Sequence, residues 1–186
     1  MQKKLFLFLA ILSVAIFSAC LFPTRFTVVN ENPSSPNFSG YKSIYLGWLD
    51  LNEEEWKNCG YASKDIWVAE IKKLNVGGLQ LYLKTELPEK TIFGASSKTD
   101  AYSGKGDIFL KFKVVELDTR IGAFKDSSFS VNVDFVDGKS GKTLYTASIV
   151  TSSFAPFPRN WKGNTFDGRL DNQIYNLAWG IAQKLR

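Results

Sequence analysis

The sequence predicts an α+β fold, a two-layer sandwich in which a mostly antiparallel sheet carries two amphipathic helices on one face. Several short segments alternate apolar and polar residues with the period of a strand, and two segments place apolar residues at helical spacing. The strands of the second half follow one another across short connections, which is typical of an antiparallel sheet. The chain has 186 residues, of which 45% are hydrophobic and 15% aromatic, so it can bury one core.

The first half is predicted to contain a strand followed by two helices. Residues 24–29 are β-prone, and apolar side chains alternate along residues 41–51. Asn52 precedes three glutamates and Ser63 precedes an amphipathic run, so each is expected to cap a helix. The glycine pair at 77–78 is expected to end the second helix.

The stretch after these glycines is predicted to be a strand and then a loop. Leu79, Leu81 and Leu83 alternate with polar or larger residues, which is the period of a half-buried strand over residues 79–87. Residues 88–105 are polar and contain a Gly-Lys-Gly sequence, so they are expected to form a loop.

The second half is predicted to form three strands and a closing helix. The adjacent Val114 and Val115 interrupt the alternation of the first of these strands and indicate a break in its register. Apolar residues at helical spacing predict a helix over residues 170–185. The predicted strands are 107–117, 129–136 and 143–152, with a hairpin turn at 137–141.

The amino terminus has the order of residues found in a bacterial lipoprotein signal. Two lysines precede a short apolar run, and the small residues Ser18 and Ala19 stand directly before Cys20. We therefore expect a lipid on Cys20; an ordinary secreted protein with a coincidental cysteine is the alternative. The predicted organisation is a signal peptide at 1–19, a lipidated tether at 20–40 and a single α+β domain at 41–186.

The residue types exclude several kinds of chemistry. The chain contains no histidine, which excludes Ser-His-Asp and Cys-His catalysis and removes the commonest zinc ligand. Glu53, Glu54 and Glu55 would point in different directions on a helix, so they are interpreted as helix-start charges. No metal site and no cofactor are predicted. With Cys20 committed to lipid, Cys59 is expected to be a buried core thiol.

Residues 138–143 end like a phosphate-binding loop, with the sequence Gly-Lys-Ser-Gly-Lys-Thr. The motif requires glycine where this chain has Val136, and the segment is expected to join two strands. It is therefore interpreted as a hairpin turn. The formal net charge of +5 contains no dense Lys/Arg block, so no nucleic-acid partner is predicted.

The aromatic loop, residues 154–168, is the best candidate for a binding surface. Phe154, Phe157, Arg159 and Trp161 are of the residue types enriched at binding hot spots. The alternative is that the loop folds back over a sheet edge or the core. The remaining tryptophans fall on or beside apolar faces and are expected in the core: Trp48, Trp56, Trp67 and Trp179.

Three short motifs resemble small envelope lipoproteins related to the penicillin-binding-protein activator LpoB and the amino-terminal domain of TolB. They are the first-strand sequence Ile-Tyr-Leu-Gly at 44–47, the strand entry Gly-Asp-Ile-Phe-Leu at 106–110, and Val-Asp-Phe-Val-Asp at 133–137 followed by Gly-Lys at 141–142. Spirochaetal lipoproteins of similar size are a second likeness. The resemblance implies an α+β domain that binds other proteins and catalyses nothing, and it assigns no functional residue.

Together these observations predict a non-enzymatic lipoprotein of the outer membrane that binds an envelope protein or peptidoglycan. Leu21 rather than aspartate follows Cys20, which favours the outer membrane. A surface-exposed lipoprotein that binds host molecules and a carrier of an apolar ligand are the alternatives.

Overall fold

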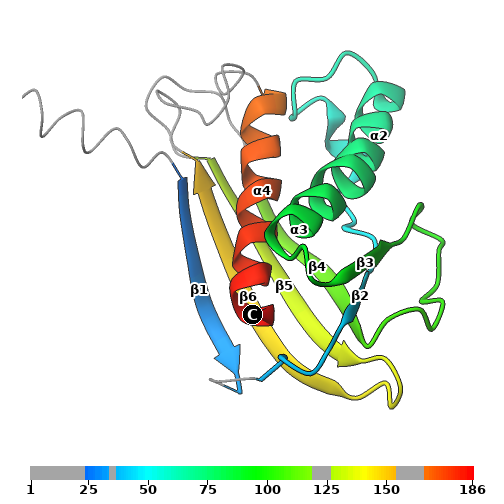
Figure 1. The fold of residues 1–186 in the computed structure, drawn as a ribbon. Helices are drawn as coiled ribbons and strands as arrows, with labels where there is room; N and C mark the ends of the chain where they lie inside the picture. Colours follow the sequence, from blue (N-terminus) through cyan, green and yellow to red (C-terminus); the bar gives the residue numbers. More distant parts are fainter. Residues whose placement is uncertain (1–23, 34–36, 119–126, 154–165) are drawn as a thin grey trace, which may run out of the picture.

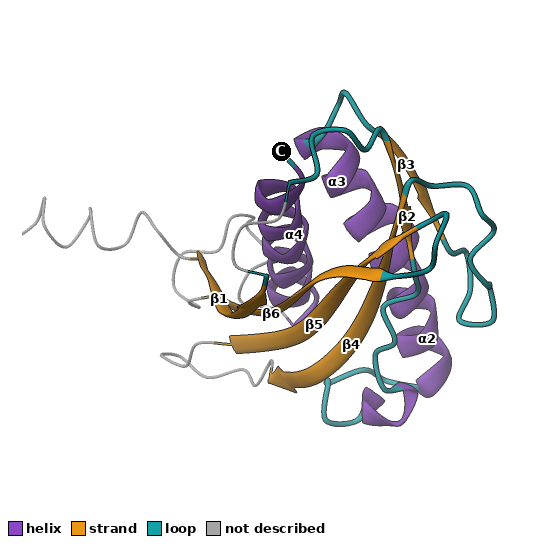
Figure 2. Cartoon of the chain, turned by 90° about the horizontal axis from the view of Figure 1, so that it is seen from below, coloured by secondary structure: helices purple, strands orange, loops and turns teal. Residues whose placement is uncertain are grey.

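The fold is seen in a computed structural model, which describes residues 24–33, 37–118, 127–153 and 166–186 (Figures 1 and 2). One six-stranded sheet packs against helices on one of its faces, so the predicted α+β class is confirmed. The elements in chain order are β1 (Thr24–Asn32), β2 (Ser43–Leu46), η1 (Glu53–Trp56), α2 (Lys64–Lys73), η2 (Leu74–Leu79), α3 (Gln80–Glu86), β3 (Thr91–Gly94), β4 (Ile108–Asp118), β5 (Ser127–Asp137), β6 (Thr143–Ser153) and α4 (Phe166–Leu185).

The sheet has an antiparallel part and a parallel part, in the strand order β1-β6-β5-β4-β2-β3. The pairs β1–β6, β6–β5 and β5–β4 are antiparallel, whereas β2 runs parallel to both β4 and β3. The sheet is therefore mostly antiparallel, as expected, but mixed. The helical segments η1, α2, η2 and α3 all lie in the crossover that makes β2 and β3 parallel.

The β5–β6 hairpin forms as predicted. Gly141 adopts a φ of 70° in the turn, and the Asp137 carboxylate accepts hydrogen bonds from the backbone N–H of Ser140 at 2.6 Å and from its hydroxyl at 2.7 Å. The glycine-lysine sequence is thus a strand-to-strand turn. The predicted break in register is also confirmed, because a bulge lies between Val114 and Glu116 in the pairing of β4 with β5.

The strand predicted at residues 79–87 is wrong, because the chain is helical there. Leu79 and Leu83 are buried four residues apart on one helix face, while Leu81 is 56% exposed. The preceding glycine pair does not end the helix; it lies in the π-helical turn η2. Gly78 is buried in this turn, and a Cβ there would make an ordinary van der Waals contact of 3.4 Å with the Ile174 side chain of α4.

Strand β3 was also missed, since residues 88–105 were expected to be a loop. It pairs with β2 over four residues at the edge of the sheet. The chain then crosses β2 to enter β4, and Tyr102 from this connection stacks on Phe109 with ring centroids 4.8 Å apart. The same ring meets Tyr45 of β2 edge-on at 5.3 Å.

The prediction of a tether at residues 20–40 is wrong for residues 24–32, because they form β1, an edge strand of the sheet. It pairs with β6 along its whole length, and Glu31 forms an ion pair with Lys184 of α4. Phe38 is also part of the core, stacked on Phe135 at 5.2 Å. The folded domain therefore starts by Thr24 rather than at residue 41.

The core lies between the sheet and the helices. Trp67 is fully buried and donates its indole N–H to the Asn52 carbonyl at 2.9 Å, and Cys59 is buried as predicted. Trp48 and Trp56 pack against the core, but Trp179 is 38% exposed, so its assignment to the core is wrong.

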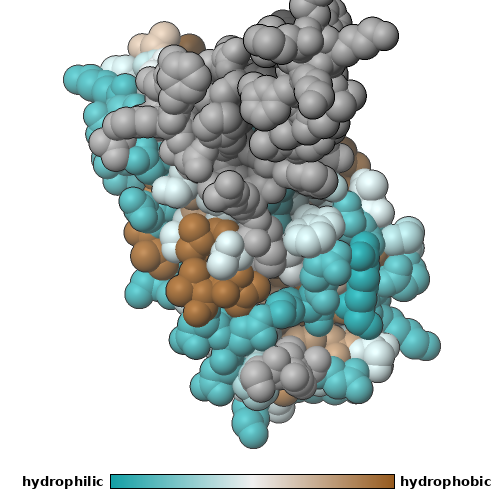
Figure 3. All heavy atoms as spheres, turned by 90° about the vertical axis from the view of Figure 1, so that its left-hand side faces the viewer, coloured by the Kyte–Doolittle hydropathy of each residue, from teal (hydrophilic) through white to brown (hydrophobic). Residues whose placement is uncertain are grey.

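In the described part of the chain, no helix has the length and apolar character needed to cross a membrane. On the side where β1 lies, apolar side chains gather among polar ones (Figure 3). Val29 of β1 is 65% exposed.

Candidate functional site

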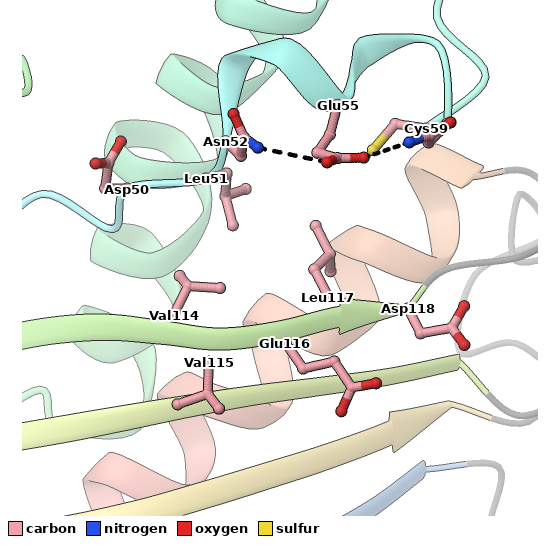
Figure 4. A pocket seen from close by; sticks show the side chains of 11 residues that line it. Asp50, Leu51, Asn52, Glu55, Cys59, Val114, Val115, Glu116, Leu117 and Asp118 are labelled. Atoms are coloured by element: carbon pink, nitrogen blue, oxygen red, sulfur yellow. Dashed lines mark hydrogen bonds between the residues drawn. The ribbon is translucent and has the colours of Figure 1, made fainter.

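A cavity of about 790 Å³ lies between residues 50–59 and the second half of β4 (Figure 4). We call it the β4 groove. Its lining consists of Asp50, Leu51, Asn52, Glu55, Asn58, Cys59, Val114, Val115, Glu116, Leu117 and Asp118.

The groove exists because β4 is much longer than its parallel neighbour β2. The two strands pair only from Ile44 with Ile108 to Leu46 with Leu110, after which the Gly47 N–H donates to the Leu110 carbonyl at 2.8 Å. A Cβ on Gly47 would lie 2.9 Å from that carbonyl oxygen, so glycine is required for this close approach. Among the described strands, β5 is the only hydrogen-bonded neighbour of β4 beyond this point.

The opposite wall is held in place by a buried asparagine of η2. Asn75 accepts a hydrogen bond from the Leu49 N–H at 2.8 Å, and its amide donates to the Leu49 carbonyl at 3.1 Å and to the Ile71 carbonyl at 3.0 Å. These bonds fix the chain just before it enters the groove wall. The π-helical turn thus places a polar side chain where it can hold an irregular segment.

The floor of the groove is apolar. Leu51 is 1% exposed and Cys59 is 6% exposed, and Val114 and Leu117 are partly buried. Figure 4 shows Val114 and Leu117 pointing from β4 toward Leu51 and η1, whereas Val115 points the opposite way.

The rim is acidic. Its carboxylates are Asp50, Glu55, Glu116 and Asp118, and none of the lining residues that the structure describes is lysine or arginine. Asp50 pairs with Lys98 at 2.7 Å on the outer side, and Glu55 accepts from the Asn58 amide at 2.5 Å. Glu116 is exposed on the rim and Glu55 faces the groove, so these two carboxylates favour a positively charged ligand over an anion.

The thiol in the floor is not set up for nucleophilic chemistry. Burial raises the pKa of Cys59 to about 11, and the negative charge of Glu55 adds to the effect. The thiol is therefore protonated at neutral pH, and a protonated thiol is a poor nucleophile and a poor metal ligand. No group of three or more potential metal ligands occurs within the ranges that the structure describes.

The predicted helix-start glutamates have separate roles. Asn52 caps η1 by accepting from the Glu54 N–H at 3.0 Å, which confirms the predicted cap. Glu54 pairs with Lys64 of α2 at 2.5 Å, and Glu55 faces the groove.

A second, shallower cavity of about 360 Å³ lies at the other end of β4 and includes Lys105 and Lys139. The Asp107 carboxylate there accepts from the N–H groups of Lys42 at 2.9 Å and Ser43 at 3.0 Å. The Lys42 hydrogen bond is the main reason that the pKa of Asp107 lies below its usual value. The aspartate thereby joins the start of β4 to the start of β2.

The residues predicted as sites lie outside the described part of the chain: Cys20, Phe154, Phe157, Arg159 and Trp161. The residues of the groove were not predicted as a site. Three sequence signals touch it: the cap at Asn52, the burial of Cys59 and the interrupted alternation at Val114 and Val115. The last could have indicated a site, because bulges concentrate at sheet edges and near binding sites.

No family model and no curated protein matches the chain. Solved structures of PelC from Paraburkholderia phytofirmans, described as dodecamers, are similar to it. One is a variant at 11% identity and a TM-score of 0.45, and the other has 13% identity and a TM-score of 0.43; each match covers 82% of this chain and 97% of PelC. At these values the likeness supports no argument about function, and the resemblance to LpoB and TolB stays a prediction.

Proposed function

We propose that this protein is a lipid-anchored lipoprotein of the outer membrane whose domain binds an envelope component, a protein or peptidoglycan, without catalysing a reaction. The observation that carries the proposal is the position of β1 relative to the lipoprotein signal. β1 begins at Thr24, and Cys20 precedes it by four residues, a span of at most about 14 Å. A lipid on Cys20 would hold the sheet against the bilayer surface.

The strand register gives the domain an orientation under this proposal. Thr24 pairs with Ser153, which pairs with Ser127, and the neighbouring Ser128 pairs with Asp118. The start of β1 and the end of β4 therefore lie at the same end of the sheet. The acidic part of the β4 groove would face the region close to the membrane, where it is accessible to other envelope proteins.

The aromatic loop is joined to the same end of the sheet through Ser153. Its proposed binding residues, Phe154, Phe157, Arg159 and Trp161, follow directly in the sequence.

The anchor is tested by metabolic labelling with an alkyne-bearing palmitate and mass spectrometry of the amino terminus. The wild-type protein and Cys59→Ser are expected to take up the label, whereas Cys20→Ser is expected to lose it. Each variant removes one of the two cysteines, so the comparison shows which cysteine carries the lipid. Labelling of Cys20→Ser, or cleavage of the leader at another residue, would overturn the anchor.

Binding of an envelope component is tested by crosslinking in intact cells and by sedimentation with purified peptidoglycan. We expect a defined crosslinked protein or specific co-sedimentation. If both experiments recover nothing, the proposal is contradicted. Protease treatment of intact cells distinguishes the host-binding alternative, because only a domain on the cell surface is cleaved.

The apolar floor of the β4 groove favours one alternative, a carrier of an apolar ligand. Leu51 and Leu117 would contact such a ligand, although four carboxylates line the same cavity. Native mass spectrometry of protein released gently from membranes is expected to show no bound lipid beyond the anchor; a stoichiometric apolar adduct would favour the carrier.

A further inference from the structure

We propose that the β4 groove binds an extended, basic segment of a partner protein, which adds as a strand to the open edge of β4. This inference deepens the proposed function and rests on it, because it names the mode and chemistry by which the domain would recognise a protein partner.

The open edge is long enough for such a strand. Residues 111–118 continue β4 past the last residue paired with β2, which at about 3.3 Å per residue gives about 26 Å of strand. The backbone groups on this side have no strand partner in the described chain. An extended peptide can satisfy them by main-chain hydrogen bonds, while its alternate side chains enter pockets beside the edge.

The groove lies where the added strand would run. In Figure 4, residues 50–59 lie along the β4 edge on the side away from β5, and the cavity separates the two. Asn75 and Trp67 hold that outer wall through hydrogen bonds to Leu49 and Asn52, so the space is maintained without an occupant. Apolar residues of the peptide would face Leu51 and Val114.

Charge complementarity identifies the occupant as basic. Glu55 and Glu116 line the groove, and none of its lining residues that the structure describes is lysine or arginine. Lysine or arginine side chains on alternate positions of the added strand would meet these carboxylates. An acidic segment would be repelled.

Features of the same strand limit unwanted pairing. The bulge at Val114–Glu116 twists the edge, and Lys111 and Lys113 stand exposed before it. Bulges and edge lysines are the usual protection against association with another sheet. Here they leave a short acidic stretch available, which suits one peptide segment rather than a whole sheet.

The inference is tested with synthetic peptides and the purified full-length mature protein. The probe is a fluorescent octapeptide of alternating lysine and valine. Its controls are the glutamate-valine peptide and a lysine-valine peptide N-methylated on every residue, which lacks the backbone N–H donors needed for strand pairing. We expect fluorescence anisotropy to show binding of the first peptide only. Hydrogen exchange should slow at those amides of residues 112–117 that point away from β5.

Charge-reversal variants locate the binding site. Glu116→Lys changes an exposed rim residue and is expected to weaken binding of the lysine-valine peptide about tenfold or more. Glu89→Lys makes the same charge change at an exposed loop residue after α3 and is expected to leave binding unchanged. Thermal unfolding of both variants checks that they remain folded.

Equal effects of the two variants, equal binding of the N-methylated peptide, or preference for the acidic peptide would overturn the inference. So would a dimer that Glu116→Lys dissociates, since the occupant would then be a second copy. Protection in the free protein of those amides of residues 112–117 that point away from β5 would show that the chain covers its own edge. Each of these results leaves the lipid label on Cys20 and crosslinking to envelope proteins intact, so the two proposals fail separately.

Discussion

The two halves of β4 differ in their surroundings although they belong to one strand. Ile108 and Leu110 are fully buried, and this half is hydrogen-bonded to β2 on one side and β5 on the other. The second half, residues 111–118, pairs with β5 alone and borders the acidic groove. Figure 1 shows β2 and β3 as short strands beside the long β4. The first half is built to stabilise the fold, and the second offers backbone groups for recognition.

The comparison teaches that the termination of β2 creates the site. Gly47 ends the pairing, and Asn75 then anchors the departing chain through Leu49. The wall of the groove is thus a consequence of how the crossover begins. Substitutions in the enclosed half and in the open half of β4 should therefore differ in their effect on the free energy of unfolding.

The largest effect is expected for Leu110→Ala in the enclosed half. Removal of a fully buried leucine leaves a cavity between the sheet and the helices, at a cost of about 2–5 kcal/mol in the free energy of unfolding. Leu81→Ala makes the same change on the exposed face of α3 and is expected to cost less than about 1 kcal/mol. Urea unfolding followed by circular dichroism measures both, and similar costs would contradict the assignment of Leu110 to the core.

The elements predicted correctly from the sequence are those whose signals are local. The β5–β6 hairpin carries alternation on both strands and a turn with a glycine at positive φ, and α2 has a serine cap at its start. The segment 79–87 failed because Leu79, Leu81 and Leu83 fit a period of two as well as a helix. Packing of η2 and α3 against α4 favours the helix, and these contacts between distant segments are not visible in one sequence.

The groove could not be predicted because its two walls are distant in the chain. Residues 50–59 and 114–118 are brought together by the parallel pairing of β2 with β4, which depends on the crossover through η1, α2, η2 and α3. The sequence indicated the irregularity at Val114 and Val115 and the burial of Cys59. It gave no indication that both would line one cavity.

A smaller effect is expected for Asn75→Ala, which acts on the wall of the groove. The substitution leaves the buried N–H and carbonyl of Leu49 without their side-chain partner, at a cost of about 1–3 kcal/mol. Asn58→Ala, at an exposed position in the same wall, serves as the control and is expected to cost less than about 1 kcal/mol. Faster hydrogen exchange at Leu49 in Asn75→Ala alone would link the loss to this segment, and unchanged exchange would contradict it.

A pH-dependent effect is expected at the entry to the enclosed half. Hydrogen bonding from Lys42 holds the pKa of Asp107 below its usual value, so its ionised form is favoured in the folded state. Its contribution is present above about pH 4, the pKa of an unfolded aspartate, and is lost as the pH falls through the lower folded value. Asp107→Asn should therefore reduce the loss of stability between pH 7 and pH 2.5 in urea unfolding.

The control for this experiment is Glu89→Gln, which removes an exposed carboxylate from the loop after α3. It should keep the wild-type difference between the two pH values. The pKa of Asp100 is also lowered, to about 2, mainly by the hydrogen bond from the Ser96 side chain. Such carboxyls keep part of the stability difference between the two pH values in every variant. An unchanged difference in Asp107→Asn would show that its bonds to β2 contribute nothing to stability.

The smallest effect is expected for Val115→Ala in the open half. Val115 is the residue of the bulge and is 57% exposed, so truncation removes little packing and should change the free energy of unfolding by less than about 0.5 kcal/mol. Urea unfolding measures this change directly. A cost as large as that of Leu110→Ala would mean that another part of the chain packs on this edge in solution. The two halves of β4 would then be equally enclosed, and the open edge would not be available to a partner strand.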